Sequence, residues 1–515
     1  MRTPASAAAL ALALASVLAR DAAPAAAQEL LAPDEIAARS RTATGFDRKP
    51  DIEREVWAVR ASGLDGTLET LRRNGDLTSA TTLGPFHTAH GIAHGVRWQQ
   101  NDNGETILDR PEPSQVERIA TQGAARVREP LDAWVVTTAY TSGHITRQFY
   151  DARTFYLVRT EKTTAGHTTR TTYDDFRADA HGHIRPWHYY GGDDRLENAY
   201  DYRLVRDDLS GNVSESDVEV PHDRRTLVEF PVGVETVRLP ARIEDNRIYV
   251  RLDMLGRGLD FLLDTGAAAL TIDESVAKSL GFAVRGRATQ TVAGSFATGR
   301  VVVPTVTIGA LSMRDVVFRT VPLSQNEAHG TRIVGLLGFD FLAACGIKID
   351  YAHGTVDAMR PGTLTAPAGL TPLGVRLNAG TPVARATVGN ASGDDFIIDT
   401  GAAFSYVLFQ RFARAHPDAA ATADGRVRRG TGVGGSLSFR SVTAKRVTLG
   451  AWSFNDAVGV EAVSPNALGF DNEDGLIGAD ILKLFTVYLD YGTNRMYLAP
   501  NGRMQMIEGA NVTRR

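Results

Sequence analysis

The sequence predicts a mainly β protein with an N-terminal antiparallel sheet and two related β units in its C-terminal half. Three observations support this fold class. Short segments of alternating apolar and polar residues follow one another, with turn residues between them. Three motifs occur twice, in the same order, in the C-terminal half. No segment of the first half has the spacing of strands joined by helical crossovers, so few helices are expected.

The composition indicates an ordinary soluble protein. Its 515 residues allow roughly three to four domains. With 43% hydrophobic residues and a net charge of −4, the chain can form several cores and gives no support for a nucleic-acid partner. A lone cysteine, Cys345, permits no internal disulfide. We expect it to be a buried structural thiol because it follows an apolar segment.

The first 27 residues have the pattern of a secretory signal peptide. Arg2 supplies a positive charge, residues 6–19 form an apolar core, and Ala25–Ala27 resemble a small-residue cleavage site. The apolar core is shorter than the about 20 residues that span a bilayer, and no later segment is apolar enough to do so. We therefore expect a periplasmic or secreted protein without a transmembrane helix in the mature chain. An uncleaved membrane anchor is the alternative.

The region 28–225 is expected to form the antiparallel sheet domain. Its first residues, 28–50, are predicted to be a mobile lead-in, and residues 51–62 a helix with an apolar stripe. A polar, acidic segment at 207–217 is the best linker candidate. The strands expected between helix and linker cover 97–100, 144–150, 154–160, 167–173, 183–190 and 199–205.

The C-terminal half carries the repeats. Phe261-Leu-Leu-Asp-Thr-Gly-Ala267 recurs as Phe396-Ile-Ile-Asp-Thr-Gly-Ala402. Each copy is followed by a Gly-Leu-Leu-Gly or Gly-Leu-Ile-Gly block and then by an Asp-Tyr block. These later blocks lie at 335–342 and 475–482, and at 347–351 and 487–491.

Repeats with so long a period indicate a duplicated domain. The first half is expected at 226–365, the second at 366–502, and a tail at 503–515. A short helix is expected after each Gly-x-Asp, with Asp340 or Asp480 as its N-cap.

The two Asp-Thr-Gly turns predict a pair of carboxylates, Asp264 and Asp399. An aspartate at the end of a buried strand is held rigidly, and the following glycine lets its carboxylate project into a cleft. Two carboxylates within about 3 Å share one proton because both cannot ionise. The ionised carboxylate can then activate water, and the protonated one can polarise a carbonyl.

These motifs resemble those of the retropepsin and pepsin-like aspartic proteases, over about half of the chain. The resemblance implies a bilobal β-barrel pseudo-dimer within one chain, a monomer that hydrolyses peptide or protein substrates. It implies no cofactor and no metal. Asp264 and Asp399 would form the catalytic dyad. Four residues would support it: Thr265, Gly266, Thr400 and Gly401.

The family also covers its cleft with glycine-rich hairpins, called flaps, and two segments match them. The flap residues would be Gly294, Ser295, Phe296, Gly434, Gly435 and Ser436. The sequence departs from the family pattern at two points, which concern the gating of substrate by the flaps and the bracing of the two halves. Neither segment has the tyrosine typical of pepsins, and Phe339 and Ala479 stand where retroviral enzymes commonly have arginine.

The N-terminal sheet resembles, in its strand rhythm, the curved sheets of bacterial periplasmic lipoprotein-carrier proteins. Most histidines lie in this region, at spacings such as His87, His90 and His94. Residues three apart on a strand face opposite sides of the sheet, so we expect no metal site there.

We therefore predict an exported aspartic endopeptidase. One alternative is a non-catalytic protease-like protein of the cell envelope that binds peptides or lipids. Another is that each half pairs with its twin in a second molecule.

Overall fold

A computed structural model gives the fold of the chain. The residues that it describes are 31–45, 51–109, 118–141, 143–164, 167–179, 181–209, 212–291, 295–323, 327–328, 331–378, 380–432, 435–463, 473–505 and 512–514. Strands dominate these residues, and the helices are short. The mainly β prediction is confirmed. The predicted signal peptide, residues 1–27, lies outside the described residues and stays a prediction.

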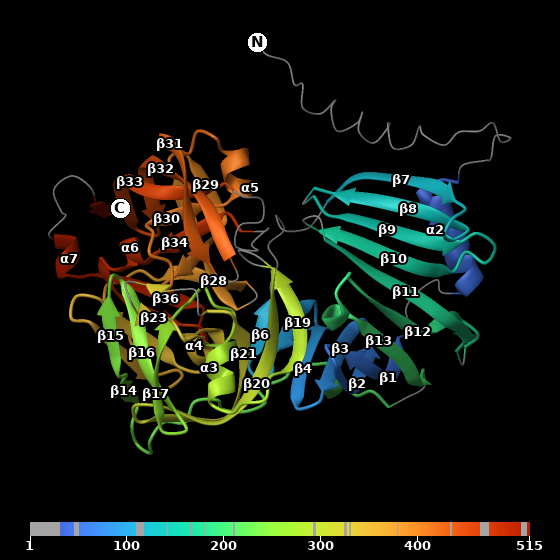
Figure 1. Cartoon of the computed structure of the whole chain (residues 1–515), viewed down its shortest axis with the longest axis horizontal. Coiled ribbons are helices and arrows are strands. Elements are labelled where there is room, and N and C mark those ends of the chain that lie inside the picture. The colour runs from blue at the N-terminus through green and yellow to red at the C-terminus, as the bar shows by residue number, and fades with distance from the viewer. Residues whose placement is uncertain are drawn as a thin grey trace, which may run out of the picture.

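The N-terminal region forms one 13-stranded antiparallel sheet, drawn in blue to green in Figure 1. Its order is β6-β5-β4-β3-β2-β1-β13-β12-β11-β10-β9-β8-β7, so the first strand pairs with the last. The strands are β1 (Ile52–Ala61), β2 (Leu64–Arg73), β3 (Asp76–Leu83), β4 (Phe86–Ala93), β5 (Val96–Gln100), β6 (Thr106–Asp109), β7 (Ile119–Val127), β8 (Ala133–Tyr140), β9 (Ile145–Asp151), β10 (Leu157–Thr164), β11 (His167–Ala178), β12 (Ile184–Gly192) and β13 (Tyr200–Asp208).

The meander of antiparallel strands is confirmed, but two local predictions in this region are wrong. The expected helix at 51–62 is strand β1. Its buried positions alternate and include Glu53 and Glu55, whose charges are met by the arginines Arg72 and Arg185. The lead-in at 28–50 contains helix α2 (Pro33–Thr44), whose Ile36 is fully buried against the sheet beside Trp134.

The C-terminal half contains two larger sheets, seen on the left of Figure 1. The eight-stranded sheet has the order β15-β16-β17-β24-β18-β21-β20-β19. Its strands are β15 (Ala241–Glu244), β16 (Arg247–Met254), β17 (Arg257–Leu263), β18 (Thr271–Asp273), β19 (Arg285–Thr291), β20 (Ser295–Ile308), β21 (Leu311–Val321) and β24 (Gly335–Leu337). β22 (Glu327–Ala328) and β23 (Thr331–Arg332) pair separately.

The 14-stranded sheet joins strands from both predicted halves. Its order is β14-β26-β25-β35-β36-β27-β28-β29-β34-β30-β33-β32-β31, with β37 added against β33. The strands are β14 (Thr236–Arg238), β25 (Gly346–Asp350), β26 (Thr355–Met359), β27 (Leu373–Asn378), β28 (Thr381–Val388), β29 (Ala391–Asp399), β30 (Tyr406–Leu408), β31 (Ala421–Gly432), β32 (Gly435–Leu449), β33 (Trp452–Ala462), β34 (Gly475–Gly478), β35 (Phe485–Asp490), β36 (Arg495–Pro500) and β37 (Val512–Arg514).

Short helices follow both Gly-x-Asp blocks as predicted, but their N-caps are the glycines Gly338 and Gly478. Asp340 lies inside its helix and accepts a hydrogen bond from the backbone of Leu270. The prediction of aspartate caps is therefore wrong. The helices of the C-terminal half are α3 (Glu274–Ser279), α4 (Phe339–Ala343), α5 (Gln410–Ala415), α6 (Ala479–Leu482) and α7 (Gly502–Gln505). Two 3₁₀ helices precede them: η2 (Leu196–Asn198) between β12 and β13, and η3 (Glu215–Asp217) after β13.

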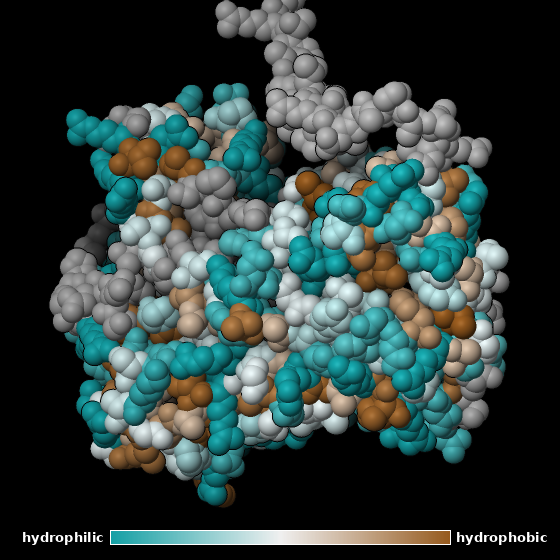
Figure 2. Space-filling model, turned by 45° about the vertical axis from the view of Figure 1, so that its right-hand side comes forward, coloured by the Kyte–Doolittle hydropathy of each residue, from teal (hydrophilic) through white to brown (hydrophobic). Residues whose placement is uncertain are grey.

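One continuous apolar core runs through the C-terminal half and includes residues from both sequence repeats. Cys345 lies in this core, and burial raises the pKa of its thiol, as expected of a structural cysteine. On the face shown in Figure 2, apolar patches are small and separated by polar side chains. No helix among the described residues is long and apolar enough to cross a membrane.

Candidate active site

The two Asp-Thr-Gly turns begin where two buried strands end. Asp264 follows β17, and Asp399 is the last residue of β29. Each strand is paired in parallel with the second repeated block of its own half: Leu262 with Leu336, and Ile397 with Leu476. In both halves, therefore, the strand that leads to the aspartate pairs with the repeated apolar block of that half.

The threonines of the two turns hydrogen-bond across to each other's strands. The Thr265 hydroxyl donates to the carbonyl of Ile398 at 2.6 Å and accepts from the backbone N–H of Thr400 at 3.0 Å. In return, the Thr400 hydroxyl donates to Leu263 O at 2.8 Å and accepts from Thr265 N at 3.1 Å. All four contacts are buried, so the turns are locked to each other by reciprocal bonds.

The glycines of the turns place each carboxylate against the opposite turn. Gly266 N donates to Oδ1 of Asp264 at 2.9 Å, and Gly401 N donates to Oδ1 of Asp399 at 2.8 Å. A Cβ at Gly266 would lie 2.8 Å from the Cγ of Asp399, and one at Gly401 would lie 2.7 Å from the Cγ of Asp264. The absence of a side chain at Gly266 and Gly401 therefore lets each carboxylate lie close to the opposite turn.

Both aspartates have raised pKa values. Burial is the main cause for Asp264, and the adjacent Asp399 carboxylate raises the pKa of Asp264 further, to well above its usual range. Burial also raises the pKa of Asp399, while the backbone N–H of Gly401 opposes the rise. A pair of this kind holds one proton between the two groups over a wide range of pH.

The glycines of the second repeated block are required by close packing against the turns. Phe339 N donates to Ala267 O at 2.9 Å, and Ala479 N donates to Ala402 O at 2.8 Å. A Cβ at Gly338 would lie 2.5 Å from the same Ala267 oxygen. Glycine at this position therefore lets the start of helix α4 pack closely against the first Asp-Thr-Gly turn.

The third repeated blocks pair with each other, because β25 and β35 are antiparallel neighbours. Each block ends in a buried tyrosine, Tyr351 or Tyr491. Burial raises the pKa of Tyr491, and the carboxylates of Asp264 and Asp399 raise it further. Sequence reasoning assigned these tyrosines no role, although their place in a repeated block was visible.

The predicted flap segments are hairpins. β19 and β20 pair up to Thr291 and Ser295, and β31 and β32 pair up to Gly432 and Gly435. Ser295 and Ser436 are exposed. Gly294 and Gly434 lie outside the residues that the structure describes.

Each hairpin contributes to an apolar cluster that extends to the Asp-Thr-Gly turn of its own half. Phe296 is buried in the first cluster, with Ala267 packed against the same residues. In the second cluster, Leu437 and Phe439 are buried and Ala402 packs beside them. Each hairpin is thus connected by packing to the turn of its own half.

One group of carboxylates in the described residues has the spacing of metal ligands, formed by Glu53, Glu55 and Asp207 of the N-terminal sheet. Arg185 forms ion pairs with all three, and Arg72 pairs with Glu53. The guanidinium groups therefore already neutralise these carboxylates, and the cluster is a structural ion-pair network.

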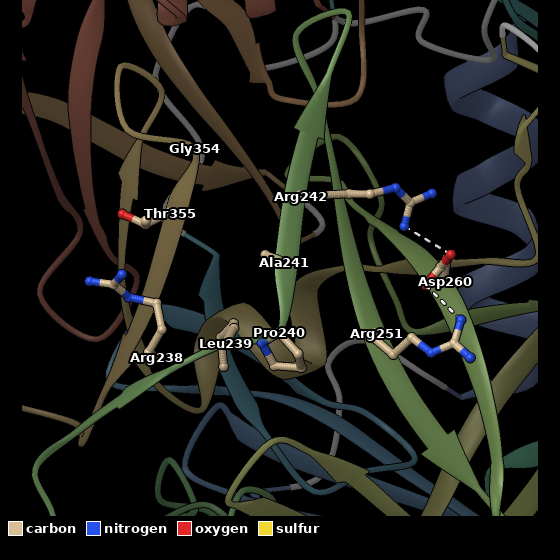
Figure 3. Close-up of a pocket in the computed structure, with 9 residues that line it drawn as sticks. All are labelled: Arg238, Leu239, Pro240, Ala241, Arg242, Arg251, Asp260, Gly354 and Thr355. Carbon is tan, nitrogen blue, oxygen red and sulfur yellow. Dashed lines mark hydrogen bonds and ion pairs between the residues drawn. The ribbon is translucent and has the colours of Figure 1, made fainter.

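A surface pocket of about 420 Å³ lies between β14, β15 and the start of β26, and neither aspartate of the dyad lines it (Figure 3). Three arginines line the pocket, and each is paired with a carboxylate. Arg242 and Arg251 both contact Asp260, and Arg238 contacts Asp357. We assign it no ligand.

Residues 250–341 match the model of a family described as aspartyl protease. A search of curated proteins found no match to the chain. Among solved structures, an aspartic proteinase from Irpex lacteus is 13% identical over 52% of this chain and 98% of its own, with a TM-score of 0.32. Basic 7S globulin from soybean is 11% identical over 53% of this chain and 97% of its own, with a TM-score of 0.31.

A putative outer membrane lipoprotein-sorting protein domain from Vibrio parahaemolyticus is 10% identical over 36% of this chain and 94% of its own, with a TM-score of 0.26. The matched family segment contains Asp264, its Asp-Thr-Gly turn and the block that supports it. Residues 250–341, the core of the first repeat, are therefore similar to the aspartyl proteases.

Proposed function

We propose that the protein is an aspartic endopeptidase whose dyad is Asp264 and Asp399. The observation that carries this proposal is the reciprocal placement of the two turns. Each turn's glycine faces the other's carboxylate, and each threonine hydrogen-bonds to the other strand. A structural pair of turns has no need to bring two carboxyl groups together at the cost of raising both pKa values.

The proposed mechanism follows from one shared proton. The ionised carboxylate takes a proton from a water molecule, which attacks the carbonyl carbon of the scissile peptide bond. The protonated carboxylic acid donates its proton to the carbonyl oxygen, so the tetrahedral intermediate forms without a separated charge. Breakdown then returns a proton to the amide nitrogen, breaks the C–N bond and releases an amine and a carboxylic acid. The threonine bonds fix both carboxylates during these steps.

The test is hydrolysis of a diverse peptide mixture by the full-length protein and by Asp264→Asn and Asp399→Asn. Asparagine has the same shape but cannot carry the proton, so each variant should lose at least about 100-fold in kcat/KM. Asp456→Asn is the matched control, because Asp456 is an exposed residue of strand β33 with φ 48°, a conformation that asparagine accepts. It should cleave as the wild type does.

Undiminished hydrolysis by both dyad variants would overturn the assignment. A wild-type protein that binds peptides without cleaving them would favour the non-catalytic binding protein instead. Melting temperatures of all four proteins should agree within a few degrees, which separates loss of chemistry from loss of fold.

The two halves are proposed to act as an internal pseudo-dimer in a monomer. Support comes from the bonds between the two threonine turns and from the β25–β35 pairing, all within one chain. Sedimentation of the active protein checks this: an activity found only in a dimer would contradict it. The hairpins carrying Ser295, Phe296, Gly435 and Ser436 are proposed to cover the bound peptide.

Export is proposed from the signal-peptide pattern of residues 1–27. Mass spectrometry of the protein recovered from an expressing bacterium should show a mature chain that begins at Gln28. Fractionation should place it in the periplasm or the medium. An intact N-terminus on a cytoplasmic protein would contradict the proposal.

A further inference from the structure

The first hairpin, β19–β20, lies between the N-terminal sheet and the rest of its own half (Figure 1). β19 is the edge strand of the eight-stranded sheet, so its outward N–H groups have no strand partner within that sheet. Residues 193–198 of the N-terminal region, which join β12 to β13 and include η2, lie against this edge.

Three side chains of the 193–198 segment bond to the hairpin near its tip. Thr289 is the focus: its backbone N–H donates to Oδ1 of Asn198 at 2.7 Å, and its hydroxyl donates to the Glu197 carboxylate. On the other strand, Arg195 donates to the hydroxyl of Ser295 at 3.3 Å. Both strands of the hairpin are therefore held, and the bond from a hydroxyl to a carboxylate is of the stronger, charge-assisted kind.

The segment itself is organised for these contacts. Asp193 accepts from the backbone N–H of Arg195 and from the side-chain amide of Asn198, both at 2.8 Å. The latter bond orients the Asn198 amide so that its oxygen faces Thr289. The hydrogen bond from Thr289 also lowers the pKa of Glu197, which keeps this acceptor ionised.

A second contact holds the base of the same hairpin. Arg300 of β20 forms an ion pair with Asp102 at 3.1 Å, and its guanidinium lies 4.0 Å from the ring centroid of Phe86. Both partners belong to the N-terminal sheet region. Contacts at the base and near the tip together fix the direction in which the hairpin extends.

We propose that Glu197 and Asn198 are positioning residues for substrate binding: through them the N-terminal sheet holds the first hairpin in place for a peptide substrate. This inference rests on the proposed endopeptidase function. A hairpin that is already held does not have to be ordered when substrate binds, so the contact favours binding. The chemical step, which takes place on the dyad, is left unchanged.

The test compares the full-length protein with Asn198→Ala and Thr289→Val, each with its own readout of the hairpin. Asn198→Ala removes the acceptor of the Thr289 N–H, and Thr289→Val removes the hydroxyl that donates to Glu197. Because each variant loses one of the two bonds, hydrogen exchange of peptides covering residues 285–291 should speed up about threefold to tenfold in both. KM for a cleaved peptide should rise about threefold to tenfold, with kcat within about twofold.

Two controls separate this role from general loss of structure. Thr289→Ser keeps the hydroxyl and should restore exchange and KM to near wild-type values. Glu215→Gln alters a glutamate of the other 3₁₀ helix, η3, and should change neither.

If hydrogen exchange stayed unchanged in both variants, the bonds from Glu197 and Asn198 would not hold the hairpin. If exchange became faster but KM did not change, these bonds would have no role in substrate binding. A wild-type protein that cleaves no peptide overturns the proposed function. Even then, the hydrogen-exchange rates of the variants show whether the bonds from Glu197 and Asn198 hold the hairpin.

Discussion

At the scale of single residues, the candidate site depends on the absence of side chains as much as on the two carboxylates. Gly266 and Gly401 each leave room for the aspartate of the opposite turn, and Gly338 leaves room for a backbone oxygen of the first turn. Neither Gly266 nor Gly401 has a positive φ, so their role here is close approach rather than backbone freedom.

Replacing Gly266 with alanine should therefore damage the dyad specifically. The new methyl group would press on the Asp399 carboxylate, and a displacement of about 1 Å costs on the order of 100-fold in rate. We expect kcat/KM for a peptide to fall by at least about tenfold. Gly374→Ala is the control, because a Cβ there meets nothing within 4 Å. Equal losses in both variants would contradict the steric explanation.

At the scale of elements, the two Asp-Thr-Gly turns form one unit. The Thr265 hydroxyl closes the gap between strands by accepting from Thr400 N and donating to Ile398 O. Either backbone group would be buried without a partner if this hydroxyl were missing. The hydrogen bonds between the two turns therefore also stabilise the C-terminal half.

Thr265→Val removes the hydroxyl and keeps the shape of the side chain. It should lower the free energy of unfolding by about 1–3 kcal/mol, since a buried donor and acceptor lose their partner. It should also lower kcat, because the carboxylates are held less firmly. Thr265→Ser keeps both bonds and should retain most of the stability and activity. Urea unfolding and peptide hydrolysis measure the two effects, and a Val variant as stable as the Ser variant would refute this account.

Much of this architecture could be predicted from the sequence, because local patterns determine it. Alternation predicted β5 and the strands β9 to β13 but not β6, β7 and β8, and the repeated blocks predicted which segments support Asp264 and Asp399. The strand at 52–61 was missed because its buried face carries two glutamates, which hydrophobic periodicity reads as exposed. Their arginine partners lie on other strands, out of reach of any local pattern.

The contacts between the two parts of the chain could not be predicted for the same reason. The side chain of Asn103 donates to Asp340, 237 residues away in sequence, and bonds to the backbone of Val317. Asn101 donates to the same carboxylate at 2.9 Å. Such a polar contact depends on how two folded surfaces meet, which no spacing along the chain records.

At the scale of the whole molecule, the N-terminal sheet and the first half share a buried polar interface. Asp340 lies on helix α4, which begins against the first Asp-Thr-Gly turn, and it accepts hydrogen bonds from both asparagines of the 101–104 turn. Two arginines, Arg224 and Arg225, bind the backbone carbonyls of this turn. The N-terminal sheet is therefore attached to the helix that begins against this turn, and its removal would take away two hydrogen-bond donors of the buried Asp340 carboxylate.

Glu105 makes this interface sensitive to pH. It is 4% exposed, and burial together with the nearby Asp340 carboxylate raises its pKa to about 8 from an ordinary value of 4.5. Between these two values the folded protein keeps a proton that the unfolded chain has lost. The free energy of unfolding should therefore fall as the pH rises from about 4.5 to about 8, by on the order of 5 kcal/mol, and stay reduced above it.

Glu105→Gln should remove that dependence, because glutamine resembles the protonated carboxyl group at every pH. Compared with the wild type, the variant should be similarly stable at pH 4 and more stable at pH 8, measured by urea unfolding followed through tryptophan fluorescence. Glu219→Gln, at an exposed glutamate of the segment that follows the sheet, should keep the wild-type slope. If the wild type and Glu105→Gln lost stability equally between pH 5 and pH 8, Glu105 would not be the group that titrates. Asp340 would then be the next candidate, because burial also raises the pKa of this second carboxyl group at the interface.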